Sequence, residues 1–229
     1  MCRRTPAPMP FKSANWCVVT VQGQVHLQDG ALILCHSECA LSNEGLLEDY
    51  LKKVVEWLDQ NPREVVTILM GNADRVNVNK YKGPLKRSGI RPYLYQAPKK
   101  YMLRKDWPTL GEMISNGSRV VFLLDYGANE RRVPFVLNEF NHMWETPFSP
   151  VDSTFPCTVD RPETWNKRQA KQRMYIANHN LNTELFSDIL VPDLDNIEKT
   201  NSVSGPSSLG KMAAECKSML NRIVLSENV

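Results

Sequence analysis

Apolar and polar residues alternate along the chain in a pattern that predicts strands and helices in succession. Two short apolar runs near the start, Trp16–Gln24 and Ala31–Cys35, are typical of strands, and a Gln-Asp-Gly turn separates them. Apolar residues then recur at helical spacing from Ser42 or Asn43 to about Gln60, where an Asn-Pro pair ends the predicted helix.

Two later runs, Glu64–Met70 and Arg119–Leu124, are almost entirely apolar and rich in β-branched residues. Strands with this composition are usually buried on both faces, as in parallel sheets. The pattern also predicts helices at Val78–Ser88, Leu110–Asn116, Val133–Phe140 and Ser208–Leu220, strands at Met174–Asn178 and Arg222–Leu225, and long loops at Thr146–Gln172 and Pro192–Pro206. Because helices lie between apolar strands, the order predicts an α/β fold with a parallel sheet or barrel.

Polar residues follow four of these strands at the point where each strand ends. They are His36, Asn72, Asp125, and the pair Asn178 and His179. The carboxyl ends of parallel strands share one edge of a sheet or barrel, and that edge carries the chemistry in α/β proteins. Each residue alone has an ordinary structural explanation, such as capping a loop, but the set favours a site. Imidazole side chains suit general acid or base work near neutral pH, and an aspartate suits orienting an imidazole or binding a hydroxyl.

Length and charge narrow the class of protein. With 229 residues, the chain has the length of one or two ordinary domains or of one α/β barrel. The net charge of +3, without a dense Lys/Arg tract, gives no reason to expect nucleic-acid binding. Neither an 18-residue apolar run nor the apolar segment of a signal peptide occurs in the sequence.

The six cysteines permit disulfides, although spacing does not determine their connectivity. Cys35 is close enough in sequence to pair with Cys39 across a turn, and Cys157 and Cys216 are candidates for a long-range pair. The Cys-His-Ser-Glu-Cys segment also has zinc-ligand residue types, but it lacks a second ligand pair at a usable spacing. We therefore expect no metal and no cofactor.

Several segments together carry a resemblance to a known family. They are VQGQVH and ALILCHSEC, YLKKVVEWLDQNPREVVTILMGN, WPTLGEMI, RVVFLLDYGA, FNHMWETPF, DSTFPCTVDRP and MYIANHNLN. In order and spacing, from Val18 to Leu225, the chain resembles the fungal branch of the PLC-like phosphodiesterases, which are similar to the X domain of phosphatidylinositol-specific phospholipase C. The resemblance implies a TIM (β/α) barrel over residues 17–229, after an irregular segment of residues 1–16.

The resemblance also implies a reaction and its residues. Family members use two histidines for metal-free phosphoryl transfer, and His36 matches the second, which protonates the leaving oxygen. Asp125 is the other expected catalytic residue. The expected substrate-binding residues are Gln24, Asn72, Asn178 and His179. The implied substrate is a phospholipid, such as phosphatidylinositol, or a small phosphodiester, with transient contact to a membrane surface. Family members are secreted, so an extracellular location is implied.

Two positions depart from the family pattern. The first histidine belongs in a Gly-Ala-His-Asp-Ser-like segment upstream of VQGQVH, but no histidine precedes His26 in this sequence. An arginine that holds the phosphate in bacterial members aligns with Gln24. We therefore expect an N-terminus that is truncated or replaced, and a barrel whose first strand is missing or altered. The alternative function is a catalytically impaired barrel that binds a phosphorylated ligand or a partner.

Overall fold

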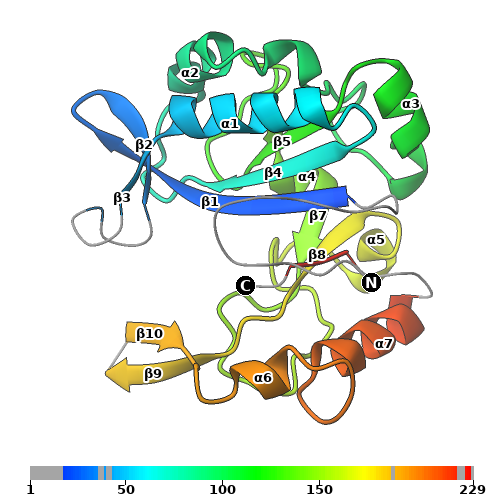
Figure 1. The fold of residues 1–229 in the computed structure, drawn as a ribbon. Helices are drawn as coiled ribbons and strands as arrows, with labels where there is room; N and C mark the ends of the chain where they lie inside the picture. The colour runs from blue at the N-terminus through cyan, green and yellow to red at the C-terminus, as the bar shows by residue number, and fades with distance from the viewer. Residues whose placement is uncertain (1–17, 36–38, 40–42, 187–188, 221–224, 228–229) are drawn as a thin grey trace. The chain divides into compact units, whose positions relative to one another are not determined.

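The structure is a computed structural model that describes residues 18–35, 39, 43–186, 189–220 and 225–227 (Figure 1). The predicted irregular segment of residues 1–16 lies outside these residues. The chain divides into two compact units. The first comprises Met1–Lys100 and Pro108–Glu139, and the second comprises Tyr101–Trp107 and Phe140–Val229. Each unit has its own cluster of buried apolar side chains.

The first unit contains a six-stranded sheet in the order β3-β2-β1-β4-β5-β6. Its strands are β1 (Val18–Gln28), β2 (Ala31–Cys35), β3 (Asn43–Leu46), β4 (Val65–Gly71), β5 (Val120–Leu124) and β6 (Leu137–Asn138). Strands β1, β4, β5 and β6 pair in parallel, while β2 and β3 add antiparallel pairs. All five residues of β5 are buried, as its apolar sequence predicts.

The β1–β2 hairpin extends the first strand beyond its predicted end. Gln28 pairs with Ala31, which leaves Asp29 and Gly30 as a two-residue loop. Both loop residues have positive φ, at 49° and 79°, which is the backbone that a type I′ hairpin turn requires. The Asp-Gly sequence adopts this backbone readily, so the strand continues to Gln28 in register with β2.

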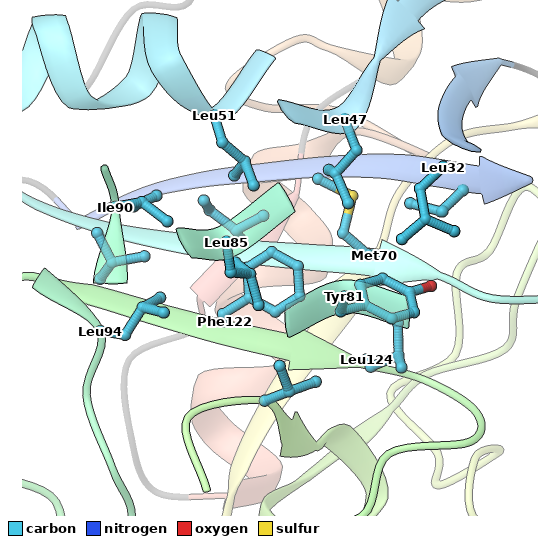
Figure 2. Close-up of a cluster of buried hydrophobic side chains, with 14 of the residues drawn as sticks. Leu32, Leu47, Leu51, Met70, Tyr81, Leu85, Ile90, Leu94, Phe122 and Leu124 are labelled. Atoms are coloured by element: carbon cyan, nitrogen blue, oxygen red, sulfur yellow. The ribbon is translucent and has the colours of Figure 1, made fainter. Parts of the chain in front are cut away.

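Helices α1 (Leu47–Gln60) and α2 (Lys82–Arg87) cover one face of this sheet (Figure 1). Figure 2 shows Leu47 and Leu51 of α1 packed toward Met70 of β4 and Phe122 of β5. The helix buries the apolar residues whose spacing predicts it, but it begins at Leu47 because Asn43–Leu46 pairs with β2 as β3. The remaining helical segments of the unit are η1 (Val78–Tyr81), η2 (Arg91–Tyr93) and α3 (Leu110–Ser115).

The second unit contains a three-stranded parallel sheet in the order β11-β8-β7, and a separate hairpin. The sheet consists of β7 (Met143–Glu145), β8 (Met174–Asn178) and β11 (Leu225–Glu227), and the hairpin of β9 (Asn182–Phe186) and β10 (Ile189–Pro192). Its helical segments are η3 (Arg104–Asp106), α5 (Lys167–Ala170), α6 (Ile197–Thr200) and α7 (Leu209–Leu220). A short helix, α4 (Glu139–His142), crosses from the first unit to the second. The Cys157–Cys216 disulfide lies in the apolar cluster of the second unit, together with the stacked rings of Trp144 and Tyr175.

One expectation about the fold is shown only in part, and the predicted elements differ from the structure at two further places. The described strands form the sheets given above and no closed barrel, so the structure shows a mixed α/β fold and does not confirm a TIM barrel. The helix predicted for Val133–Phe140 is wrong: Leu137 pairs with Leu123 of β5, and only Glu139–His142 is helical. Strands β7, β9 and β10 lie in segments without a strand prediction.

Candidate functional site

Three of the predicted site residues lie at one edge of the first sheet. Gln24 of β1 pairs with Gly71 at the end of β4, and Met70 of β4 pairs with Leu124 at the end of β5. Asn72 and Asp125 directly follow these two strands. The parallel register therefore brings Gln24, Asn72 and Asp125 to the same edge.

Asp125 is held in place by main-chain donors. Its Oδ1 atom accepts hydrogen bonds from the backbone N–H of Asn72 at 2.7 Å and from that of Tyr126 at 2.6 Å. Hydrogen bonds to an ionised carboxylate are short and strong, so they fix the orientation of this half-buried side chain. The Oδ2 atom lies beside Gly71, 3.7 Å from the point where a Cβ would be on that glycine.

Asn72 organises the loop between β4 and η1. Its side chain is fully buried, and Nδ2 donates to the carbonyl oxygens of Val76 and Tyr126, both at 3.0 Å. Its Oδ1 accepts from the Val76 N–H at 3.0 Å. Both amide hydrogens are thus engaged with the main chain. This geometry gives Asn72 a positioning role, and binding of substrate by Asn72 stays a prediction.

Gly127 makes the Asn72 arrangement sterically feasible. The residue has a φ of 76°, and a Cβ there would lie 3.0 Å from Asn72 Nδ2. A glycine is needed because other residues rarely adopt this backbone and because the side-chain amide lies so close.

Two further side chains, Arg75 and Tyr81, lie near the charged groups of this edge. The exposed Arg75 guanidinium lies over the Tyr126 ring, 4.2 Å from its centroid. Below the edge, burial, together with the negative charges of Asp125 and Asp74, raises the pKa of Tyr81 well above its usual value. The Tyr81 hydroxyl, labelled in Figure 2, has no hydrogen-bond partner among the described residues. Tyr81 therefore stays protonated near the carboxylates of Asp125 and Asp74.

A histidine that the sequence pattern did not single out lies beyond this edge, on β1. The Nδ1 atom of His26 lies 3.1 Å and 3.2 Å from the two carboxylate oxygens of Asp74. The Leu27 N–H also donates to Asp74 Oδ2 at 3.3 Å. The Cys35–Cys39 disulfide, one of the two predicted pairs, lies next to the His26 ring.

The other two predicted residues of the set, Asn178 and His179, belong to the second unit. Asn178 Nδ2 donates to Glu145 Oε2 at 3.1 Å and to the Thr146 carbonyl at 3.0 Å. The Glu145 side chain is 1% exposed and forms an ion pair with Arg161, whose Nε lies 2.9 Å from Oε2. The Arg161 guanidinium also lies 3.9 Å from the centroid of the Phe148 ring. The ion pair of Glu145 and Arg161 thus holds the carboxyl ends of β7 and β8 in place. The pattern of apolar and polar residues in the sequence did not predict this pair.

His179 is buried, and both of its ring nitrogens have neighbours. Its Nε2 donates to the Thr200 carbonyl oxygen at 2.8 Å, while Nδ1 contacts Met212 Sδ at 3.0 Å. The Phe155 ring centroid is 3.9 Å from that of the imidazole. Burial lowers the pKa of His179, and the hydrogen bond to Thr200 opposes this shift in part. These contacts favour a packing role, and its role in substrate binding stays a prediction.

The lowered pKa of His179 predicts how stability depends on pH. Since the native pKa lies below the usual 6.5, the unfolded chain binds this proton first as the pH falls. The stabilisation is complete above about pH 6.5 and decreases as the pH falls toward the native pKa. Urea unfolding between pH 7.5 and 5 should show a shallower loss of stability for His179→Gln than for the wild type. Equal slopes for the two proteins would contradict this assignment.

A polar cavity of about 440 Å³ opens in the second unit beside the β9–β10 hairpin. Asp193, Lys199, Thr200 and Ser207 contribute to its lining. None of the predicted site residues is among the residues that line it. His36 lies outside the described residues, and the structure does not test its placement.

The edge of the first sheet has features that are typical of a broad class of ligand-binding proteins. A parallel sheet whose strand ends carry an ordered aspartate and amide side chains is the arrangement of α/β proteins that bind ligands at the carboxyl edge. The family model described as PI-PLC X 1 matches residues 12–225. The chain therefore belongs to the PI-PLC X domain family.

Two curated relatives, both from Arthroderma benhamiae, are similar to this chain. One, named an uncharacterized secreted protein, is 46% identical over 205 residues, which are 88% of this chain and 46% of the relative. The other, named PI-PLC X domain-containing protein 1, is 38% identical over 205 residues, which are 88% of this chain and 66% of the relative. The chain thus spans about half of one relative and just under two thirds of the other. No solved structure matches the chain.

Proposed function

We propose that the protein is a phosphoric diester hydrolase of the phosphatidylinositol phospholipase C type. The observation that carries the proposal is the edge of the first sheet, where Gln24 and the main-chain-bound Asp125 lie together in a chain of the PI-PLC X family. The proposed substrate is phosphatidylinositol or a related phosphodiester. We also propose the family's TIM barrel as the architecture, supported by a parallel sheet in each unit.

The proposed reaction is an in-line displacement at phosphorus. A substrate hydroxyl attacks the phosphorus atom and gives up its proton to solvent water, the bond to the leaving oxygen breaks, and His36 donates the proton that the leaving oxygen takes up. The Gln24 amide donates a hydrogen bond to a phosphate oxygen, and the Asp125 carboxylate orients the donors around it. The exposed Arg75 guanidinium adds positive charge at this edge, which favours binding of the phosphate anion.

Replacing Asp125 by Asn tests the role of the ordered carboxylate. The substitution removes the charge that strengthens the hydrogen bonds from the backbone N–H groups of Asn72 and Tyr126. The loop between β4 and η1 is then held less firmly, and the side chains at this edge lose their fixed orientation. We expect phosphatidylinositol cleavage to fall by about 10²-fold or more, with kcat affected more than KM.

A matched control is Asp152→Asn in the second unit. Asp152 also accepts a main-chain hydrogen bond, from Thr154 at 2.8 Å, but it lies outside the proposed site. This variant should keep wild-type turnover. Equal loss of activity in both variants, or full activity in Asp125→Asn, would remove Asp125 from the proposed mechanism.

The substrate class is tested by comparing vesicles that contain phosphatidylinositol, vesicles that contain only phosphatidylcholine, and soluble glycerophosphodiesters. The proposal predicts release of a phosphorylated headgroup from phosphatidylinositol in preference to the other two. Binding of inositol phosphates without cleavage of any of them would favour the alternative function, a barrel that binds a phosphorylated ligand.

We further propose that the protein works outside the cell, in transient contact with a membrane surface. One relative is named a secreted protein, and disulfides such as the two seen here persist in oxidising compartments. Leu185, Leu190, Leu194 and Ile197, on and beside the β9–β10 hairpin, are exposed apolar side chains suited to such contact. Among the described residues, none of the helices is long and apolar enough to cross a bilayer.

A further inference from the structure

Three metal-ligating side chains meet at the end of the β1–β2 hairpin. A ring nitrogen of His26 and the sulfur atoms of Cys35 and Cys39 all lie within 4.8 Å of one another. The two cysteines form a disulfide, which occupies both sulfur atoms. His26 reaches them from β1 because its backbone pairs directly with Ile33, two residues before Cys35 on β2.

The His26 ring is held in the orientation that a metal-binding histidine has. Since Asp74 accepts from Nδ1, the proton of the neutral ring is on Nδ1, and the lone pair is on Nε2. Histidines that bind zinc usually donate their other N–H to a carboxylate in this way. Nε2 is buried and has no hydrogen-bond partner among the described residues. A buried nitrogen acceptor without a partner destabilises the folded protein, because the atom has lost its hydrogen bond to water. A metal ion bound to Nε2 would remove this destabilisation.

We propose that reduction of the Cys35–Cys39 disulfide converts this cluster into a Zn²⁺ site formed by His26 Nε2 and the two cysteine sulfurs. An external dithiol supplies two electrons and two protons: it becomes a disulfide, the Cys35–Cys39 S–S bond breaks, and two thiols form. Zn²⁺ then displaces one proton from each thiol, and two Zn–S bonds and one Zn–N bond form. A water molecule takes the fourth position.

The ligand set and its dimensions favour zinc over harder cations. One imidazole and two thiolates are the donors that Zn²⁺ prefers, and a Cys-x₃-Cys spacing is within the usual range for zinc sites. Tetrahedral bonds of about 2.0–2.3 Å place neighbouring ligand atoms about 3.3–3.8 Å apart. The two sulfur atoms, bonded to each other in the disulfide, separate to this distance after reduction, and the ring nitrogen of His26, now within 4.8 Å of both, needs to approach them by only about 1 Å.

The disulfide and the metal site exclude each other because they use the same two sulfur atoms. In the oxidised protein, a disulfide joins Cys35 at the end of β2 to Cys39. In the reduced protein, coordination of one Zn²⁺ ion would join the same two residues. The proposed site therefore couples the zinc affinity of the chain to the redox potential around it. Its three ligands are not among the proposed catalytic residues, and zinc binding is measured without a substrate, so the proposed metal site and the proposed hydrolase activity can fail separately.

The test is a titration of the full chain with Zn²⁺ and with Co²⁺. The disulfides are first reduced with a phosphine, which is converted to its oxide. The excess phosphine and the oxide are then removed under anaerobic conditions. We expect the reduced protein to bind one equivalent of Zn²⁺ and to show, with Co²⁺, the absorption of a tetrahedral site with thiolate ligands. The oxidised protein should bind neither metal at this site.

Four variants identify the ligands. His26→Gln and Cys39→Ser each remove one ligand and should lose at least about 100-fold in Zn²⁺ affinity, while Asp74→Asn should lose about 10–100-fold. Cys216→Ser removes one thiol of the other described pair and should bind zinc as the wild type does. If Cys216→Ser fails to fold, the Zn²⁺ affinity of reduced His26→Gln still tests the proposal, because this variant keeps every cysteine. Equal Zn²⁺ affinity of the reduced wild type and His26→Gln would overturn the proposal, as would equal affinity of the oxidised and reduced wild type.

Discussion

Replacing His36 by Ala is expected to lower the rate of phosphatidylinositol cleavage by about 10²–10⁴-fold, the usual contribution of a general acid or base. The variant cannot protonate the leaving oxygen, so the loss should appear in kcat rather than in KM. The basic limb of the pH–rate profile, which reports the protonated acid, should also disappear. Steady-state assays on phosphatidylinositol vesicles from pH 5 to 9 measure both effects.

A second histidine in the same unit provides the control. His26→Gln changes an imidazole on β1 that contacts Asp74 and lies outside the proposed catalytic set. Assayed with its disulfide intact, this variant should keep the activity and the pH profile of the wild type. Full turnover by His36→Ala, with unchanged folding, would remove His36 from the mechanism. Loss of activity in His26→Gln alone would transfer the acid–base role to that residue.

Replacing Glu145 by Ala is expected to destabilise the protein by about 3–5 kcal/mol, the usual cost of breaking a buried ion pair from one side. Glu145 is 1% exposed, and the Arg161 side chain that it neutralises is 20% exposed. Without the carboxylate, the guanidinium is left largely buried without its counter-ion, and Asn178 loses the acceptor for one of its hydrogen bonds. Urea unfolding, followed by tryptophan fluorescence, measures the change.

The control for Glu145→Ala is an ion pair at the surface. Lys211 and Glu215 on α7 lie 3.6 Å apart, and both side chains are 47% exposed. Water and salt screen such pairs, so Lys211→Ala should change the free energy of unfolding by less than about 1 kcal/mol. A loss of similar size in both variants would show that burial does not determine the strength of the Glu145–Arg161 pair.

The elements that the sequence predicted well are those with a complete local signal. Strands β4 and β5 follow from continuous apolar runs, and α1 follows from apolar residues on one helical face. The shared edge of Asn72 and Asp125 also follows, because parallel pairing places the ends of successive strands at one edge.

The elements that the sequence did not reveal depend on partners distant in the chain. Val133, Val136 and Leu137 have helical spacing, yet Leu137 pairs with β5, and local spacing cannot distinguish the two outcomes. Strand β7 has only three residues and is defined by pairing with β8. The contacts of His26 with Asp74 and of Glu145 with Arg161 join residues 48 and 16 positions apart, for which a single sequence carries no signal.

We propose that this chain of the PI-PLC X family cleaves phosphodiesters by acid–base chemistry at the edge that carries Asp125. The most direct measurement is the release of inositol phosphate from phosphatidylinositol vesicles by the full chain, with and without a chelator such as EDTA. Release at the same rate is expected in both conditions, because the proposed transfer uses no metal. Absence of release in either condition, or release that the chelator abolishes, would contradict the proposed mechanism.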